Sequence, residues 1–292
     1  MRGPARIVLP LILLAGLVSC SSAPSSLPSA SGQSAPPRDT VSRANARELM
    51  SSLLLLALAS AGHQARFEST YFECMSRAGF DVPLSVRPAP GDAQPPDIRS
   101  LDEKSRDEVA KFAYLSSSGG VEKEDDPLGK WISSLPADAQ QRYNVADVGS
   151  GTKTRTINIG GLSTTFSLEG CNYEALRAEW GDVDEFYSLT NEANAARLHL
   201  QDLVGTDKDF LASKSRWKAC LSKAGYAATE DPGSMPRNSI DRSNAQVALA
   251  DYDCRQSSGL AAARQEALVA AVSSDLGRLT DLSTRIRKFV NS

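Results

Sequence analysis

The chain has 292 residues, of which 32 are basic and 35 are acidic, so its formal net charge is −3. Loss of an N-terminal signal peptide removes two of the basic residues and none of the acidic ones, which lowers the net charge to −5. This acidic balance argues against a nucleic-acid partner and against an electrostatic membrane patch.

The first 20 residues have the layout of a secretory signal peptide. Arg2 and Arg6 form a short positive region, and the apolar run 7–18 is too short for a membrane-spanning helix. The run ends in Leu-Val-Ser-Cys, which resembles the lipobox of bacterial lipoproteins, whose cysteine is diacylated and becomes the first residue of the mature chain. This resemblance implies a lipid on Cys20 that anchors the protein to the outer face of the cell membrane. An ordinary cleaved signal peptide with a chance cysteine is the alternative.

Residues 21–40 are rich in Ser, Pro and Ala and hold too few large apolar side chains to pack. We interpret them as a flexible tether between the membrane and a single helical ectodomain over 41–292. Each buried CH₂ of a lipid contributes about 0.8 kcal/mol, and stable anchoring takes more than one chain. A diacylated Cys20 would meet that requirement.

The first half of the ectodomain favours helices. Residues 41–79 predict one long helix or a broken pair of helices. Ser100, followed by an acid three residues later, has the pattern of a capping box and predicts a helix that runs to about Tyr114. Pro136 suits the first turn of a short helix through Tyr143.

One segment favours strands instead. Residues 154–168 hold two β-rich runs around a Gly-Gly pair, which is typical of a β-hairpin. Helical patterns then return: one helix ends at Gly205, the next begins at Thr206, another covers 247–254, and a last long one covers 260–290. The expected fold is mainly α, a bundle-like single domain with a small hairpin.

Four cysteines remain once Cys20 is assigned to the lipid, and an even number in an exported chain makes disulfides the default. Four cysteines allow three connectivities, and their spacing alone does not choose among them. The chain reads CMSRAGF from residue 74 and CLSKAGY from residue 220, and each copy opens a half that contains one later cysteine. The simplest pairing keeps each disulfide within its own half and joins Cys74 to Cys171 and Cys220 to Cys254.

The repeat also predicts two helix ends. Tyr71 and Trp217 lie three residues before the two cysteines, so each aromatic ring shares a helix face with the sulfur that follows it. The glycine of each copy falls where a helix ends in a left-handed residue, and the next aromatic can fold back onto the last turn. A zinc site or a catalytic cysteine is a weaker interpretation, because close cysteine pairs and a nearby histidine are both missing from the sequence.

Motifs between residues 126 and 256 carry a family resemblance. They are Asp-Pro at 126–127, SLPADAQQRY at 134–143, Gly-Cys at 170–171, WKAC at 217–220 and ALADYDC at 248–254. This order resembles a group of uncharacterised secreted or lipid-anchored lipoproteins of actinobacteria. The resemblance implies a fold, a disulfide pattern and a location in the cell envelope. It implies no activity, and residues 81–119 have no counterpart in it.

Patterns for catalysis or metal binding are incomplete. The run at 149–154 has Thr where a P-loop has Gly before its Lys, and 161–165 lacks the second glycine of a nucleophile elbow. The acids at 182–185 lack the Gly and distal Glu of a calcium loop and indicate a helix start. Asp251 is singled out because it lies one turn before Cys254, although a hydrogen bond to a nearby cap or Arg is its simpler role. We therefore assign no catalytic residue, no cofactor and no metal site.

The expected function is a non-catalytic binding or structural role at the cell envelope. The membrane is one partner, through the lipid on Cys20, and envelope proteins or the cell wall are the others. An extracytoplasmic hydrolase that acts on cell-wall or peptide substrates is an alternative from another class, and it needs two suitably placed carboxylates. A small-molecule receptor is a further alternative, and it needs a cavity between the helices.

Overall fold

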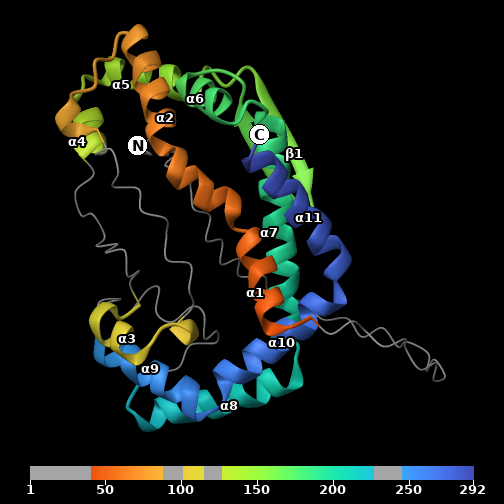
Figure 1. The fold of residues 1–292 in the computed structure, drawn as a ribbon. Helices are drawn as coiled ribbons and strands as arrows, with labels where there is room; N and C mark the ends of the chain where they lie inside the picture. The colour runs from red at the N-terminus through yellow and green to blue at the C-terminus, as the bar shows by residue number, and fades with distance from the viewer. Residues whose placement is uncertain (1–40, 88–100, 115–126, 227–244) are drawn as a thin grey trace, which may run out of the picture.

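The computed structural model describes residues 41–87, 101–114, 127–226 and 245–292 (Figure 1). The expected signal peptide, Cys20 and the tether over 21–40 lie outside this part of the chain. Within the described ranges, no helix combines the length and the apolar character that a membrane crossing requires.

The fold is mainly α with one small hairpin, which confirms the expected fold class. In chain order, the helices and strands are α1 (Arg43–Ser52), α2 (Leu55–Arg77), η1 (Leu84–Val86), η2 (Leu101–Glu103), α3 (Arg106–Phe112), α4 (Pro127–Ser134), α5 (Ala137–Val148), β1 (Thr154–Ile159), β2 (Leu162–Ser167), α6 (Cys171–Trp180), α7 (Val183–Gly205), α8 (Lys208–Lys223), α9 (Ala245–Ser257), α10 (Leu260–Ser274) and α11 (Leu276–Val290).

Helix α7 is the centre of the main hydrophobic core. It packs against α10, α11 and both strands of the hairpin, and α1 packs against α10 and α11 beside it (Figure 1). Buried apolar side chains recur along α7 at helical spacing, which is why this 23-residue helix has one side in the core. The largest core members include Trp180, Phe186, Leu189, Leu200, Trp217, Leu260, Leu279 and Ile286.

Two smaller apolar clusters lie at opposite ends of the molecule (Figure 1). One gathers around Met75, Phe80 and Tyr143, where α2, α4, α5 and α6 meet. The other gathers around Val109 and Ala248, where α3 packs against α9. Each copy of the repeat therefore lies toward a different end of the fold.

The hairpin lies flat on α7. Its two strands pair antiparallel, with Thr156 opposite Thr165. The side chain of Asn191 on α7, which is 4% exposed, accepts a hydrogen bond from the Thr164 hydroxyl at 2.8 Å. In the turn, Gly160 has a φ of +59°, and an added Cβ there would lie 2.4 Å from the Cβ of Ala195, so only glycine lets the hairpin come this close. The second strand then leads directly into α6.

Several predicted helix boundaries are wrong. The short helix expected to end at Tyr143 continues to Val148. The capping box is formed by Ser105 and Glu108 rather than by the similar pattern five residues earlier, so a short 3₁₀ helix precedes α3. Helix α8 is capped by Asp207 rather than Thr206, because the Asp207 carboxylate accepts the N–H groups of the first turn.

A further boundary concerns the last long helix, which is two helices. Asp275 leaves the helical backbone conformation, with φ −125° and ψ 21°, and separates α10 from α11. The break lets α10 pack against α8 and α9 while α11 packs against α1 and α2. At the other end of the chain, the predicted broken pair over 41–79 is confirmed as α1 and α2.

Candidate functional site

Both predicted disulfides are present. Cys74 pairs with Cys171 at a Cα–Cα distance of 5.4 Å, and Cys220 pairs with Cys254 at 5.6 Å. The loops that they close span 97 and 34 residues, and in the chain-entropy account each stabilises the fold by about 4 to 5 kcal/mol. Two structural disulfides indicate an oxidising, extracytoplasmic environment for the folded chain.

Each copy of the repeat ends a helix in the same way, as the sequence predicted. Gly79 and Gly225 have φ values of +89° and +85°. The aromatic residue after each glycine donates its amide N–H to the carbonyl of the residue that follows the cysteine, at 2.9 Å in the first copy and 3.0 Å in the second. This is a Schellman motif, so the common part of the two copies is a helix terminus joined to a disulfide.

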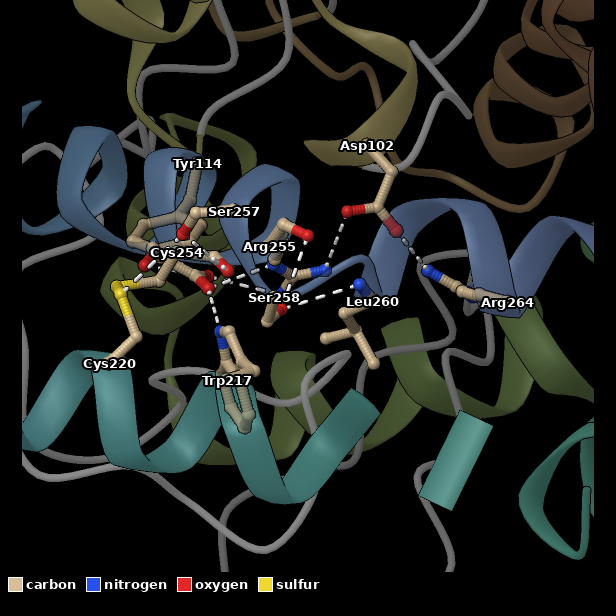
Figure 2. Close-up of polar contacts among 11 residues, drawn as sticks. Asp102, Tyr114, Trp217, Cys220, Cys254, Arg255, Ser257, Ser258, Leu260 and Arg264 are labelled. Carbon is tan, nitrogen blue, oxygen red and sulfur yellow. Dashed lines mark hydrogen bonds and ion pairs between the residues drawn. A yellow bond between two sulfur atoms is a disulfide. The ribbon is translucent and has the colours of Figure 1, made fainter. Parts of the chain in front are cut away.

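A buried polar cluster lies beside the second copy and is the strongest candidate for a site (Figure 2). At its centre, Asp251 on α9 has no exposed surface. Its Oδ1 accepts hydrogen bonds from Trp217 Nε1 and Arg255 Nε, both at 2.8 Å. Its Oδ2 accepts from the Tyr114 hydroxyl at 3.1 Å and from Arg255 Nη2 at 3.0 Å. Four donors thus occupy the two carboxylate oxygens.

Arg255 connects this carboxylate to a second one. The guanidinium is 3% exposed and donates from Nη1 to Asp102 Oδ1 at 3.2 Å. The other oxygen of Asp102 accepts from Arg264 Nη1, also at 3.2 Å. Burial lowers the pKa of Arg255, but the two carboxylates outweigh burial and the net change of this pKa is upward. Arg255 therefore remains charged, and the cluster joins η2, α9 and α10.

Tyr114 adds α3 to the same cluster. Burial, reinforced by the charge of Asp251, raises the pKa of this tyrosine far above its usual value. The phenol therefore stays protonated and acts as a donor. The residue before it, Ala113, has a φ of +51°, which is unfavourable for a residue with a Cβ and is maintained by the contacts around it.

This geometry makes Asp251 a structural residue rather than a catalytic one. A general base must reach a proton of the substrate and must offer a lone pair to it. Asp251 has no contact with solvent, and its oxygens already accept four hydrogen bonds. The interpretation that this Asp is bonded to a nearby Arg is confirmed.

A different polar cluster lies beside the first copy. The hydroxyls of Tyr71 and Tyr143 are 3.0 Å apart, and Tyr71 also forms a hydrogen bond with the carboxylate of Asp147 on α5. Burial raises the pKa of Asp147, and the hydrogen bond from Tyr71 offsets only part of this rise. Among the described residues, no salt bridge to Asp147 is found. This carboxylate therefore depends on neutral donors.

The remaining motifs take structural positions. The run at 149–154 is a turn that leads into β1, whereas a P-loop leads into a helix. Asp182 caps α7 by accepting the N–H of Glu185 at 2.9 Å, as the predicted acidic helix start implied. His199 is exposed on α7. The part of the chain that the structure describes holds no group of three His, Cys, Asp or Glu side chains able to bind a metal ion.

Most of the polar cluster at the second copy was not predicted from the sequence. A signal existed for Arg255, which lies four residues after Asp251 and thus one helical turn away. Asp102 and Tyr114 gave no comparable signal, because each lies more than 130 residues from its partner in the chain.

The fold and its clusters define a disulfide-braced helical protein in which Arg255 is paired with Asp251 and Asp102 inside the fold. No family model matches the chain, and no curated protein or solved structure shows significant similarity to it. Its residues and their geometry are therefore the basis on which a function can be assigned.

Proposed function

We propose that this chain is a lipid-anchored protein of the cell envelope with a non-catalytic binding or structural role. The pattern Leu-Val-Ser-Cys at Cys20, which resembles the lipobox of bacterial lipoproteins, supports the anchor. The Ser/Pro/Ala-rich segment 21–40 supports a tether, and the two disulfides agree with an oxidising compartment. The motifs between 126 and 256 support a relation to actinobacterial lipoproteins.

The saturated carboxylate of Asp251 is the observation that carries the non-catalytic role. It was the one acid with a specific reason to act as a catalyst, and four donors occupy it in a fully buried position. Its neighbour Asp102 is neutralised by two guanidinium groups. Two-carboxylate hydrolysis requires accessible groups on either side of a substrate bond, and this pair faces the interior of the protein instead.

A small-molecule receptor is the second candidate. A groove with a volume of about 460 Å³ lies between α1 and α11, which is within the range of ligand pockets in proteins. This groove favours a receptor over a purely structural protein.

The anchor can be tested by mass spectrometry of the chain expressed in a bacterium that processes lipoproteins. We expect the wild-type mature chain to begin at Cys20, to carry a diacylglyceryl mass and to sediment with membranes. The Cys20→Ala variant should lack this mass and should not be processed at the same position. A mature wild-type chain without acyl mass, or processing that resists globomycin, would contradict the anchor.

The role can be tested with the oxidised chain from Arg38 to Ser292, exposed to solubilised envelope proteins and to sacculi. Mass spectrometry of the bound material should identify a specific and saturable partner. Release of cleaved wall fragments would favour the hydrolase and would count against a non-catalytic role. A matched control is the same chain with both disulfides reduced and alkylated, which should lose the partner.

A further inference from the structure

One helix has a charge opposite to that of the whole chain. Helix α8 contains five basic residues and one acidic residue, so its side chains carry a net charge of +4, whereas the formal net charge of the chain is −3. At physiological ionic strength a charge is screened beyond about 8 Å, so a partner that touches α8 experiences mainly the charges of α8. The acidic balance of the whole chain therefore does not exclude an anionic partner for this helix.

The lysines of α8 lie away from the core. The inner side of the helix is buried, with Trp217 at its centre. Lys208 and Lys223 are exposed on the opposite side. Lys214 and Lys218 are half-buried, and a lysine in such a position covers apolar surface with its stem while its ammonium group stays in water. The positive charge of α8 is therefore concentrated on its solvent side.

Most of these charges are not compensated within the fold. Among the described residues, no salt bridge to Lys208, Lys214 or Lys223 is found. Three arginines of α11 differ, because each forms an ion pair with an acidic side chain. Arg216, the fifth basic residue of α8, donates to the carbonyl of Ser258 at 3.1 Å and so has a role inside the fold. The lysines are left to face a partner outside it.

An exposed apolar side chain lies among the lysines. Leu211 is 44% exposed. It precedes Lys214 by three residues and Lys218 by seven, so the three side chains share one flank of α8. Leucine beside several lysines is typical of helices that lie in the interface of a membrane. We call Lys208, Leu211, Lys214, Lys218 and Lys223 together the basic face.

The described chain begins close to this helix. The N–H of Val41 donates to the Ser273 hydroxyl on α10 at 3.3 Å, and α10 packs against α8. In Figure 1, α1 begins beside α10, and α8 runs along the lower edge of the molecule. A flexible chain of 20 residues, the length of the proposed tether over 21–40, spans about 25 Å on average. A lipid on Cys20 would therefore hold α8 within reach of the membrane surface.

We propose that the basic face of α8 contacts the anionic phospholipid headgroups of the membrane that holds the anchor. The ammonium groups of Lys208 and Lys223 contact headgroup phosphates, and Leu211 enters the layer between the headgroups. The lipid raises the local concentration of the face at the membrane, so a weak affinity is enough to orient the domain. This inference rests on the lipid anchor proposed above and assigns the surface of the domain that faces the membrane.

The test is co-sedimentation of the mature chain with large vesicles. The chain covers residues 20–292 and carries Cys20→Ser, so it has no lipid and only its own surface can bind. We expect it to bind vesicles of equal parts phosphatidylglycerol and phosphatidylcholine about tenfold or more tightly than vesicles of phosphatidylcholine alone, and we expect added salt to weaken this binding. Lys208→Gln combined with Lys223→Gln should weaken it by about tenfold or more, and Leu211→Ala by a smaller factor.

A matched control removes the same number of charges elsewhere. Arg142 on α5 and Lys288 on α11 are exposed, so Arg142→Gln combined with Lys288→Gln changes the net charge equally and should leave vesicle binding unchanged. Far-UV circular dichroism checks that the variants fold. If the double variant of α8 does not fold, Lys208→Gln and Lys223→Gln are measured singly, each with an expected loss of about fivefold.

Several outcomes would overturn the inference. They are equal binding to both kinds of vesicle, binding to neither, and an equal loss in the control variant. Binding to soluble poly-L-glutamate as tight as that to the anionic vesicles would assign the face to an acidic polymer and would overturn it as well. The anchor is judged separately by the acyl mass on Cys20. A lipidated chain whose lipid-free form ignores anionic vesicles would keep the anchor and reject the basic face.

Discussion

At Cys74 and at Cys220, an aromatic residue one helical turn before the cysteine forms a hydrogen bond with a carboxylate, which is half-buried in the first case and fully buried in the second. Tyr71 meets Asp147 and Trp217 meets Asp251. The two carboxylates nevertheless have different surroundings. Asp251 is paired with a buried guanidinium, whereas the described neighbours of Asp147 include no ion-pair partner. The repeat thus defines a helix end and an aromatic donor, while residues outside the repeat decide how the charge is compensated.

The two copies also differ in the loops that their disulfides close, and removal of a disulfide should have the largest effect. Replacing both cysteines of a pair by alanine should lower the free energy of unfolding by about 4 to 5 kcal/mol for either pair. The loop closed by Cys74 and Cys171 spans 97 residues and the other 34, so losing the first should cost about 1 kcal/mol more. Urea unfolding of the two double variants measures both values. A larger loss at the shorter loop would contradict the entropic explanation.

The next largest effect should come from Arg255, the buried cation beside the second copy. Arg255→Met leaves two buried carboxylates facing a neutral side chain, and it should lower the free energy of unfolding by about 3 to 5 kcal/mol. Arg142→Met is the matched control. Arg142 pairs with Asp138 on α5, where both side chains are about 70% exposed, and its loss should cost no more than about 0.5 kcal/mol. Similar losses in both variants would refute a special role for Arg255.

The same substitution at the carboxylate beside each copy should have effects of opposite sign. Asp251→Asn removes a charge that Arg255 requires, so it should destabilise the protein at neutral pH. Asp147→Asn removes a charge that burial disfavours and keeps an oxygen that accepts from Tyr71, so it should stabilise the protein by a smaller amount. Thermal unfolding at pH 7 tests both, and destabilisation by both variants would remove the contrast.

The pH dependence follows from the direction of the pKa shift at Asp147. Its pKa is raised in the folded protein, so the folded state binds the proton more tightly than the unfolded state does. The resulting stabilisation is fully present below the unfolded pKa of about 4 and is lost as the pH rises through the folded value. The advantage of Asp147→Asn should therefore disappear in acid. Asp138→Asn, at an exposed position of the same helix, should show no such trend.

A second pH-dependent effect should come from Glu179 on α6, the helix that begins at Cys171. Burial raises its pKa to about 7, and the charge of Arg66 offsets part of this rise. Stability should therefore decrease as the pH rises through about 7, and Glu179→Gln should flatten this part of the profile. Unfolding midpoints between pH 5 and pH 8 are the measurement. A profile that Glu179→Gln leaves unchanged would show that this carboxyl does not cause the slope.

Local patterns were enough to predict much of the fold. The Gly-Gly pair at 160–161 and the glycine of each repeat determine structure within one or two turns, and these predictions are confirmed. Helical periodicity located the helices but missed the break at Asp275. Exact boundaries were harder, because Ser100 and Ser105 start equivalent patterns and it is the second that caps α3. The lipid on Cys20 stays a prediction.

The polar clusters could be predicted only in part. The pairing of Arg255 with Asp251 is local to one helix, and the aromatic donor is local to each repeat. Tyr114 contacts Asp251, and Asp102 contacts Arg255, through tertiary packing. The spacing of residues along the chain does not predict such contacts.

The order of the disulfides along the chain also has a mechanical consequence. If a lipid holds the protein at its N-terminus, a force on the C-terminus stretches the chain. Covalent closure of the loops of 97 and 34 residues excludes them from extension, which shortens the fully stretched chain by about 450 Å. Under tension only the chain outside these loops can lengthen, so the disulfides limit the length to which the protein can be stretched.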